Sequence, residues 1–144
     1  KHAITLAILF GLFLFNRKKQ GDEISDFFDM KISEFREYSQ KYGITIVQAH
    51  PFRDGISPAD PALLDGVETF NMHPSHNSCI ALATRYAKEH PHFITTCGTD
   101  FHHDTQQGLG GILAKVLPKD SFELVNLLKS RDYLFNVAGS IVIP

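Results

Sequence analysis

Residues 93–103 of this chain read FITTCGTDFHH and decide the fold. The apolar first half predicts a buried strand, and the polar second half places a carboxylate and an imidazole, Asp100 and His102, two residues apart. In extended backbone, residues i and i+2 point to the same side, so these two side chains are expected to converge. An oxygen donor beside a nitrogen donor suits Zn, Mn or Fe.

A second apolar run, residues 44–49 (ITIVQA), ends at another histidine, His50. Parallel strands in α/β enzymes carry their functional side chains at the carboxyl ends. Two strands that each end at a metal-ligand type of residue therefore predict a metal site. The other histidines are expected to be loop residues; His73 and His76 could lie at the edge of such a site or belong to a helix-capping segment.

Outside these two runs, strands and helices alternate along the chain. The hydrophobic periodicity and the turn residues predict helices at 22–42 (ended by Gly43), 78–88 and from Pro118, strands at 66–70, 111–116, 133–137 and 140–143, and a short helix near 61–64. Asp120 or Ser121 is expected to cap the third helix, whose buried face includes Phe122. Strands alternating with helices predict an α/β fold with parallel pairing, as a barrel or an open sheet.

The chain opens with an apolar run at residues 3–15, which is shorter than the ~20 residues that cross a membrane. We expect this run to be a buried strand, the protein to be cytoplasmic without a membrane partner, and the chain to be truncated before it. A net charge of −2 gives nucleic-acid binding no support. Cys79, on a buried helix face, and Cys97, at a strand end, are expected to be reduced thiols.

Four segments in order resemble the later motifs of the polymerase and histidinol phosphatase (PHP) superfamily: Ala49-His50-Pro51, residues 66–71 (GVETFN), Asn77 before an Ala-rich helix, and residues 98–102 (GTDFH). The glycine-rich residues 108–111 and the helix after Pro118 resemble the way such domains finish.

The resemblance implies a distorted (β/α)7 barrel that holds two or three divalent metal ions (Zn, Mn or Fe) and hydrolyses phosphoesters. His50, Asp100 and His102 match metal-ligand positions of the family, and His2 resembles a further one. Glu68 matches a family position other than that of the metal-bridging glutamate, and its part in catalysis is less clear. Arg53, three residues after His50, either grips a substrate phosphate or is a solvated arginine paired with Asp54 or Asp60.

The family's opening His-x-His pair, a second histidine and a bridging glutamate have no match. Residues 1–144 are therefore expected to form a single partial PHP domain, its C-terminal half. Its unpaired apolar first strand is expected to pair with the missing half or to drive self-association. The expected function is hydrolysis of a small phosphorylated substrate, which could be a nucleotide, by a metal-activated water. The alternatives are a non-catalytic PHP-like scaffold or metal-binding fragment, and an amidohydrolase-like deacylase.

Overall fold

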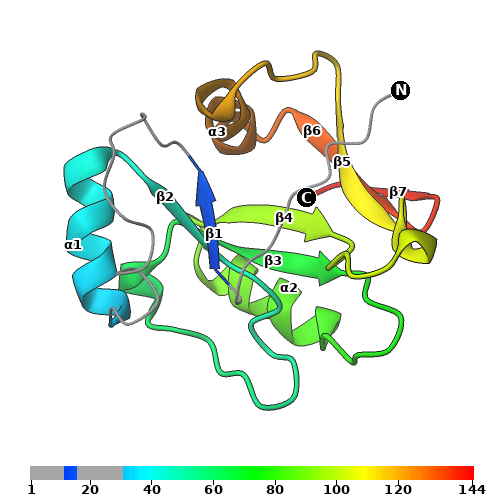
Figure 1. Ribbon diagram of the computed structural model, residues 1–144, viewed down its shortest axis with the longest axis horizontal. Helices are drawn as coiled ribbons and strands as arrows, with labels where there is room; N and C mark the ends of the chain where they lie inside the picture. The colour runs from blue at the N-terminus through cyan, green and yellow to red at the C-terminus, as the bar shows by residue number, and fades with distance from the viewer. Residues whose placement is uncertain (1–11, 16–30) are drawn as a thin grey trace.

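The computed structural model describes residues 12–15 and 31–144 of the chain, which form a mixed α/β structure with two small sheets (Figure 1). The first sheet has the strand order β1-β2-β3-β4, with bounds Leu12–Phe15, Thr45–Gln48, Gly66–Asn71 and Ile94–Gly98. The second has the order β5-β6-β7, with bounds Gly110–Ala114, Tyr133–Val137 and Ser140–Val142. The predicted α/β class is confirmed.

Helices lie in each of the predicted regions: α1 (Ile32–Tyr42), α2 (Ile80–Glu89), α3 (Ser121–Ser130) and the short 3-10 turn η2 (Pro61–Leu63). A second 3-10 turn, η3 (Asp104–Gln106), was not predicted. Gly43 ends α1 with a left-handed φ of 66°, which glycine adopts at low cost. Asp120 caps α3, because its side chain accepts a hydrogen bond from the main-chain N–H of Glu123 (2.8 Å). The first helix was predicted to run from residue 22, but Lys31 has the extended backbone of an N-cap residue, so α1 begins at Ile32. Residues 22–30 lie outside the described residues.

The prediction of parallel pairing holds only for β2, β3 and β4. β1 runs antiparallel to β2, and the second sheet is antiparallel throughout. One physical reason is the short connection between β6 and β7. Ala138 and Gly139 have φ values of 49° and 87°, the positive values that a tight hairpin turn requires, and such a turn reverses the chain. A parallel crossover needs a far longer connection.

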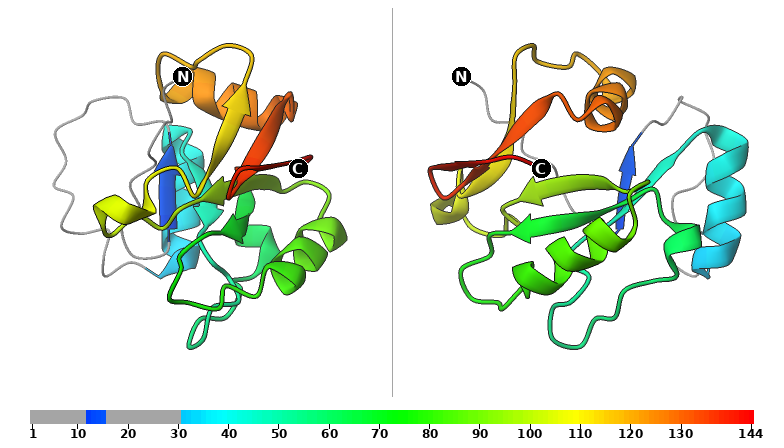
Figure 2. Two further views of the ribbon diagram at one scale, coloured as in Figure 1. Left: turned by 90° about the vertical axis from the view of Figure 1, so that its right-hand side faces the viewer. Right: turned by 180° about the vertical axis from the view of Figure 1, so that it is seen from behind.

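The first sheet lies between two packing layers (Figures 1 and 2). On one face, residues of α1 and α2 form a core cluster with Ile46, Val67 and Phe93. On the other, α3 and β6 cover the sheet, and Leu128 and Phe135 pack with Val47. Phe122, predicted to be buried, is 52% exposed, because it stands in the first turn of α3, on the side away from this cluster.

Both cysteines are free thiols, as predicted. Cys79 is not on a buried helix face: it precedes α2 as its N-cap residue and is only partly buried. Cys97 is buried in β4, and burial raises the pKa of its thiol to about 11. An unactivated thiol of this kind is a packing group rather than a nucleophile.

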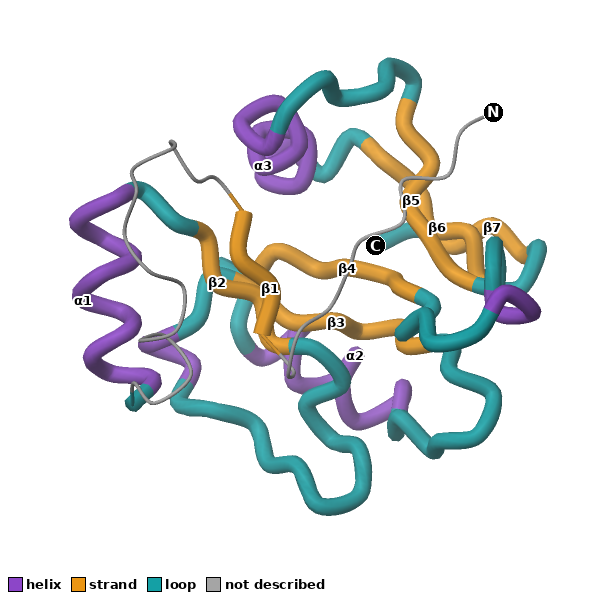
Figure 3. Tube along the Cα trace, in the orientation of Figure 1, coloured by secondary structure: helices purple, strands orange, loops and turns teal. Residues whose placement is uncertain are grey.

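The predicted first strand is described only over β1, which forms the outer strand next to β2, while residues 1–11, including His2, lie outside the described residues. Within the described part of the chain, no helix is long and apolar enough to cross a membrane. The second sheet continues beside β4, as Figure 3 shows, so that the carboxyl ends of β3 and β4 lie near β5.

Replacement of Gly66 by alanine should destabilise the fold. Gly66 pairs with Ile94, and a Cβ at this position would lie 2.2 Å from the Ile94 carbonyl oxygen, so the two strands would have to separate. We expect Gly66→Ala to lower the free energy of unfolding by about 1–3 kcal/mol in urea titrations. Gly111→Ala, on β5 with no atom within 4 Å of the added carbon, is the control and should be close to neutral. Equal stability of the two variants would contradict the pairing.

Candidate functional site

The candidate site lies at the carboxyl ends of the three parallel strands, where the chain leaves β2, β3 and β4. His50 follows β2 and Asp100 follows β4, and they are only 6% and 4% exposed. Both residues have left-handed backbone, with φ values of 31° and 50°. Non-glycine residues avoid this region, and such conformations concentrate at functional sites. The two strand ends therefore share an uncommon conformation that aims both side chains.

The structure brings Asp100 and His102 together, with 3.3 Å between Asp100 Oδ1 and His102 Nε2. The sequence-based reason was wrong, since the left-handed backbone of Asp100 is not the extended conformation on which the i, i+2 rule depends. The His102 side chain is 60% exposed, so it forms the solvent side of the pair.

Arg53 forms an ion pair with Asp100 Oδ2, not with Asp54 or Asp60. The same Nη2 atom donates a hydrogen bond to Asn71 Oδ1 (3.1 Å). Burial alone would raise the pKa of Asp100, but the hydrogen bond and charge of Arg53 outweigh it, so this pKa lies below its ordinary value. Asp100 is therefore an ionised carboxylate neutralised by a guanidinium.

Glu68 lies beneath this pair in β3 and is only 1% exposed. Its Oε2 accepts hydrogen bonds from the main-chain N–H of His50 (3.0 Å) and from Asn71 Nδ2 (2.8 Å). Burial raises the pKa of Glu68 to about 7, although both hydrogen bonds act in the opposite direction. Burial and then the Arg53 charge lower the pKa of His50, which favours the neutral imidazole that can coordinate a metal.

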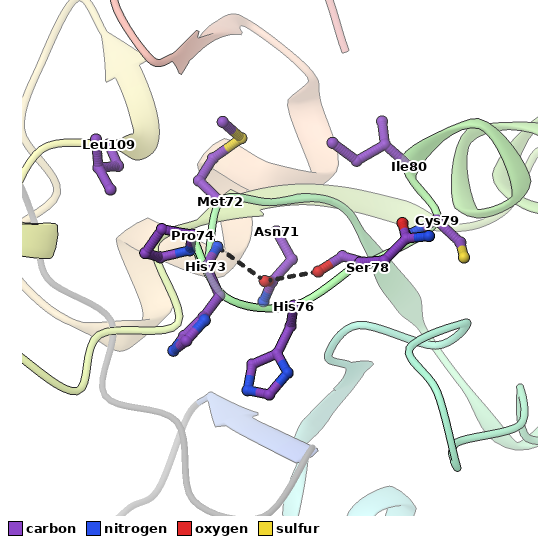
Figure 4. A pocket seen from close by; sticks show the side chains of 10 residues that line it. Asn71, Met72, His73, Pro74, His76, Ser78, Cys79, Ile80 and Leu109 are labelled. Carbon is purple, nitrogen blue, oxygen red and sulfur yellow. Dashed lines mark hydrogen bonds between the residues drawn. The ribbon is translucent and has the colours of Figure 1, made fainter.

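Asn71 connects the strand ends to the loop before α2. Its Oδ1 accepts hydrogen bonds from Ser78 Oγ (2.9 Å) and from the main-chain N–H of His73 (3.2 Å), as Figure 4 shows. Beside Asn71 lies a pocket of about 480 Å³, whose apolar lining includes Met72, Ile80 and Leu109. A pocket of this size can hold a small organic group beside Asn71, His73 and His76.

Three imidazoles gather at the edge of the site. The ring centroids of His73 and His76 lie 4.5 Å apart, and those of His73 and His102 lie 5.5 Å apart. The structure thus supports the site-edge interpretation of His73 and His76. His90 and His92 belong to the other end of β4, where they pack against Phe93 with centroid distances of 5.2 and 4.5 Å.

The side chains at the site have the right chemistry for a metal, but the described residues do not complete a ligand set. Across residues 31–144, no group of three or more His, Cys, Asp or Glu side chains is placed to hold an ion. Three buried side-chain atoms of the site, His50 Nδ1, Arg53 Nε and Glu68 Oε1, have no hydrogen-bond partner. An orphaned buried imidazole nitrogen is a ligand-type atom, while Asp100 is engaged by Arg53. Metal binding stays a prediction.

From the sequence, Glu68 matched only a family position that is not a metal ligand, and Asn71 and Ser78 were given no role in the site. One signal was present: Glu68 is a carboxylate inside a short strand that is otherwise made of apolar and small residues. A charged residue in such a strand is rarely buried unless it is paired. Asn71 and Ser78 carry no comparable signal, because Asn and Ser are common in loops for many reasons.

No protein-family model matches the chain, and no curated protein sequence matches it. Its function must therefore be inferred from the geometry of the site.

The raised pKa of Glu68 predicts how stability depends on pH. Between 4.5, the ordinary value, and about 7, the folded state keeps a proton that the unfolded state releases. The stability that this group contributes is therefore complete below about pH 4.5 and is lost as pH rises through 7. In Glu68→Gln this dependence should vanish. From pH 5 to 8 the wild-type protein should lose on the order of 1–3 kcal/mol relative to the variant in urea titrations.

The control is Glu89→Gln, at the exposed end of α2, which should follow the wild-type pH profile. Parallel profiles for wild type and Glu68→Gln would show that Glu68 is ionised at all these pH values.

Proposed function

We propose that this chain provides one wall of a metal-dependent phosphoesterase site of the PHP type. The observation that carries the proposal is that Asp100, after β4, contacts both His102 and an arginine from the loop after β2, the same loop that carries the buried His50, at the carboxyl ends of parallel strands. The substrate is a small phosphorylated compound, and a nucleotide is within this class.

The corresponding fold is part of a distorted (β/α)7 barrel. The parallel strands β2, β3 and β4, with α2 connecting β3 to β4, are the repeating unit of such a barrel. β5 lies beside β4, at the position where the next strand of a barrel would lie. The antiparallel sheet of β5, β6 and β7 is a departure from the regular repeat.

In the proposed site, Asp100, His102 and His50 hold divalent metal ions through a carboxylate oxygen and imidazole nitrogens. Bound metal would lower the pKa of a water molecule and provide hydroxide near neutral pH. Because the described residues offer no complete ligand set, further ligands must come from other residues of this chain, such as His2, or from another polypeptide. Asp100 must exchange its Arg53 partner for the metal.

Besides its ion pair with Asp100, Arg53 binds the substrate phosphate in this proposal. The Arg53 side chain is 14% exposed, and its guanidinium donates a hydrogen bond to Asn71. A planar guanidinium binds phosphate oxygens through two parallel hydrogen bonds. When a phosphoester arrives, Arg53 can turn from the carboxylate to the phosphate and leave Asp100 free. The same residue thus orients the substrate and regulates access to Asp100.

A non-catalytic PHP-like scaffold is the second candidate, and the Arg53–Asp100 ion pair favours it. A carboxylate already neutralised by a partly buried guanidinium needs no metal for its charge balance. The scaffold predicts that neither metal nor phosphate changes the stability of the protein, whereas the phosphoesterase predicts that both do.

If Asp100 and His102 are metal ligands, replacing either one should reduce metal content and phosphoesterase activity together. In the protein as the cell makes it, Asp100→Asn and His102→Ala should each lower Mn²⁺ content and hydrolysis of a generic phosphomonoester together, by at least about tenfold, because each removes one metal bond. His90→Ala and His92→Ala, at the other end of β4, are the controls and should retain both. Unchanged metal content in Asp100→Asn would refute the assignment.

Arg53→Met should separate phosphate binding from metal binding. The variant keeps an apolar side chain of similar length but loses the guanidinium, so affinity for inorganic phosphate should fall by about tenfold or more. Affinity for Mn²⁺ should rise, because Asp100 loses its competing cation. Calorimetric titration measures both, with Arg85→Met on the exposed side of α2 as the control. Weaker Mn²⁺ binding in Arg53→Met would contradict the competition.

A further inference from the structure

We infer that Glu68 and Asn71 are a buried pair of positioning residues, which sets the His50 and Arg53 loop for the reaction; this inference rests on the proposed function. Neither side chain is assigned to the metal or to the substrate. Each contacts a residue that has such a role in the proposed site. Glu68 accepts a hydrogen bond from the backbone of His50, and Asn71 accepts one from the guanidinium of Arg53.

An irregularity in β3 is what allows Glu68 and Asn71 to meet. In a regular strand, residues three apart point to opposite faces of the sheet. The register between β3 and β4 shifts here, since Glu68 pairs with Thr96 but Phe70 pairs with Cys97, so Thr69 is an extra residue. This bulge changes the alternation and puts both side chains on one side, where they form a 2.8 Å hydrogen bond.

Glu68 fixes the start of the loop after β2. The N–H of His50 has Glu68 Oε2 as its acceptor, at the residue where the backbone turns into the left-handed region with a φ of 31°. Gly98 of the neighbouring strand leaves room for the carboxylate, since a Cβ there would lie 2.6 Å from Oε1. Burying a carboxylate is costly, and replacement by an apolar residue is often neutral or stabilising. Stability alone therefore does not account for a glutamate here.

Asn71 transmits this constraint to Arg53. Its Nδ2 donates to the Glu68 carboxylate, which fixes the orientation of the amide and turns Oδ1 toward the donors on the other side. Oδ1 then accepts from Arg53 Nη2 (3.1 Å) and from Ser78 Oγ (2.9 Å). The hydrogen bonds run from His50 through Glu68 and Asn71 to Arg53 and Asp100. The ends of all three parallel strands are thereby held in one arrangement.

The test compares two substitutions at Glu68. Glu68→Gln retains one oxygen that can accept both hydrogen bonds, with its amide nitrogen in the place of Oε1, whereas Glu68→Leu has similar size and no acceptor. We expect Glu68→Leu to speed amide hydrogen exchange at His50 and to lower kcat/KM for a phosphomonoester, each by about tenfold or more, the effect of leaving a buried main-chain N–H without its acceptor. Glu68→Gln should restore both to within about threefold.

Thr96→Val is the matched control. Thr96 lies directly opposite Glu68, is 4% exposed, and has a buried hydroxyl without a hydrogen-bond partner, so its replacement disturbs the same region without touching the network. It should change neither measurement. Wild-type exchange at His50 in Glu68→Leu, or a Glu68→Gln variant as impaired as Glu68→Leu, would overturn the inference. A further outcome separates the two proposals. If amide exchange at His50 is faster in Glu68→Leu but the wild-type protein has no phosphoesterase activity, the proposed function is refuted and the positioning of His50 by Glu68 remains supported.

Discussion

The hydrogen bond from the His50 main chain to the buried Glu68 carboxylate is the interaction on which the rest of the site depends. It joins the ends of β2 and β3 at the point where the chain leaves the sheet. Asn71 extends the connection to Arg53, and Arg53 to Asp100 after β4. Because an unpaired buried carboxylate is costly, these residues must be satisfied together, and the loops that they hold are fixed relative to one another.

The charge balance at Asp100 gives this fixed arrangement two possible states. With Arg53 on the carboxylate, the site is neutral and closed to cations. With Arg53 on a substrate phosphate, Asp100 and the nearby His102 imidazole become available together. Phosphate and metal would then favour each other's binding, since both need the same ion pair to open. A scaffold would keep the first state permanently.

Much of the fold follows from the sequence, because periodicity and turn residues identify single elements. The antiparallel pairing of the second sheet does not, because it depends on tertiary packing and on a hairpin turn at Ala138 and Gly139 that has no strong signature. In the site, the pairing of Asp100 with His102 was predicted, but from an extended backbone that Asp100 does not have, so the spacing rule does not explain it. The pair of Glu68 with Asn71 could not be predicted, because a bulge shifts the strand alternation on which such predictions rest.

Paramagnetic broadening by Mn²⁺ in amide NMR spectra tests the central claim most directly. If the ends of β2 and β4 form a wall of a metal site, substoichiometric Mn²⁺ should broaden the amide resonances of Ala49, His50, Phe52 and residues 99–103 first. Inorganic phosphate should strengthen the effect, because it draws Arg53 away from Asp100. The resonances of His90 and His92 should stay sharp. Broadening confined to His90 and His92, or none at the strand ends with phosphate present, would contradict the account.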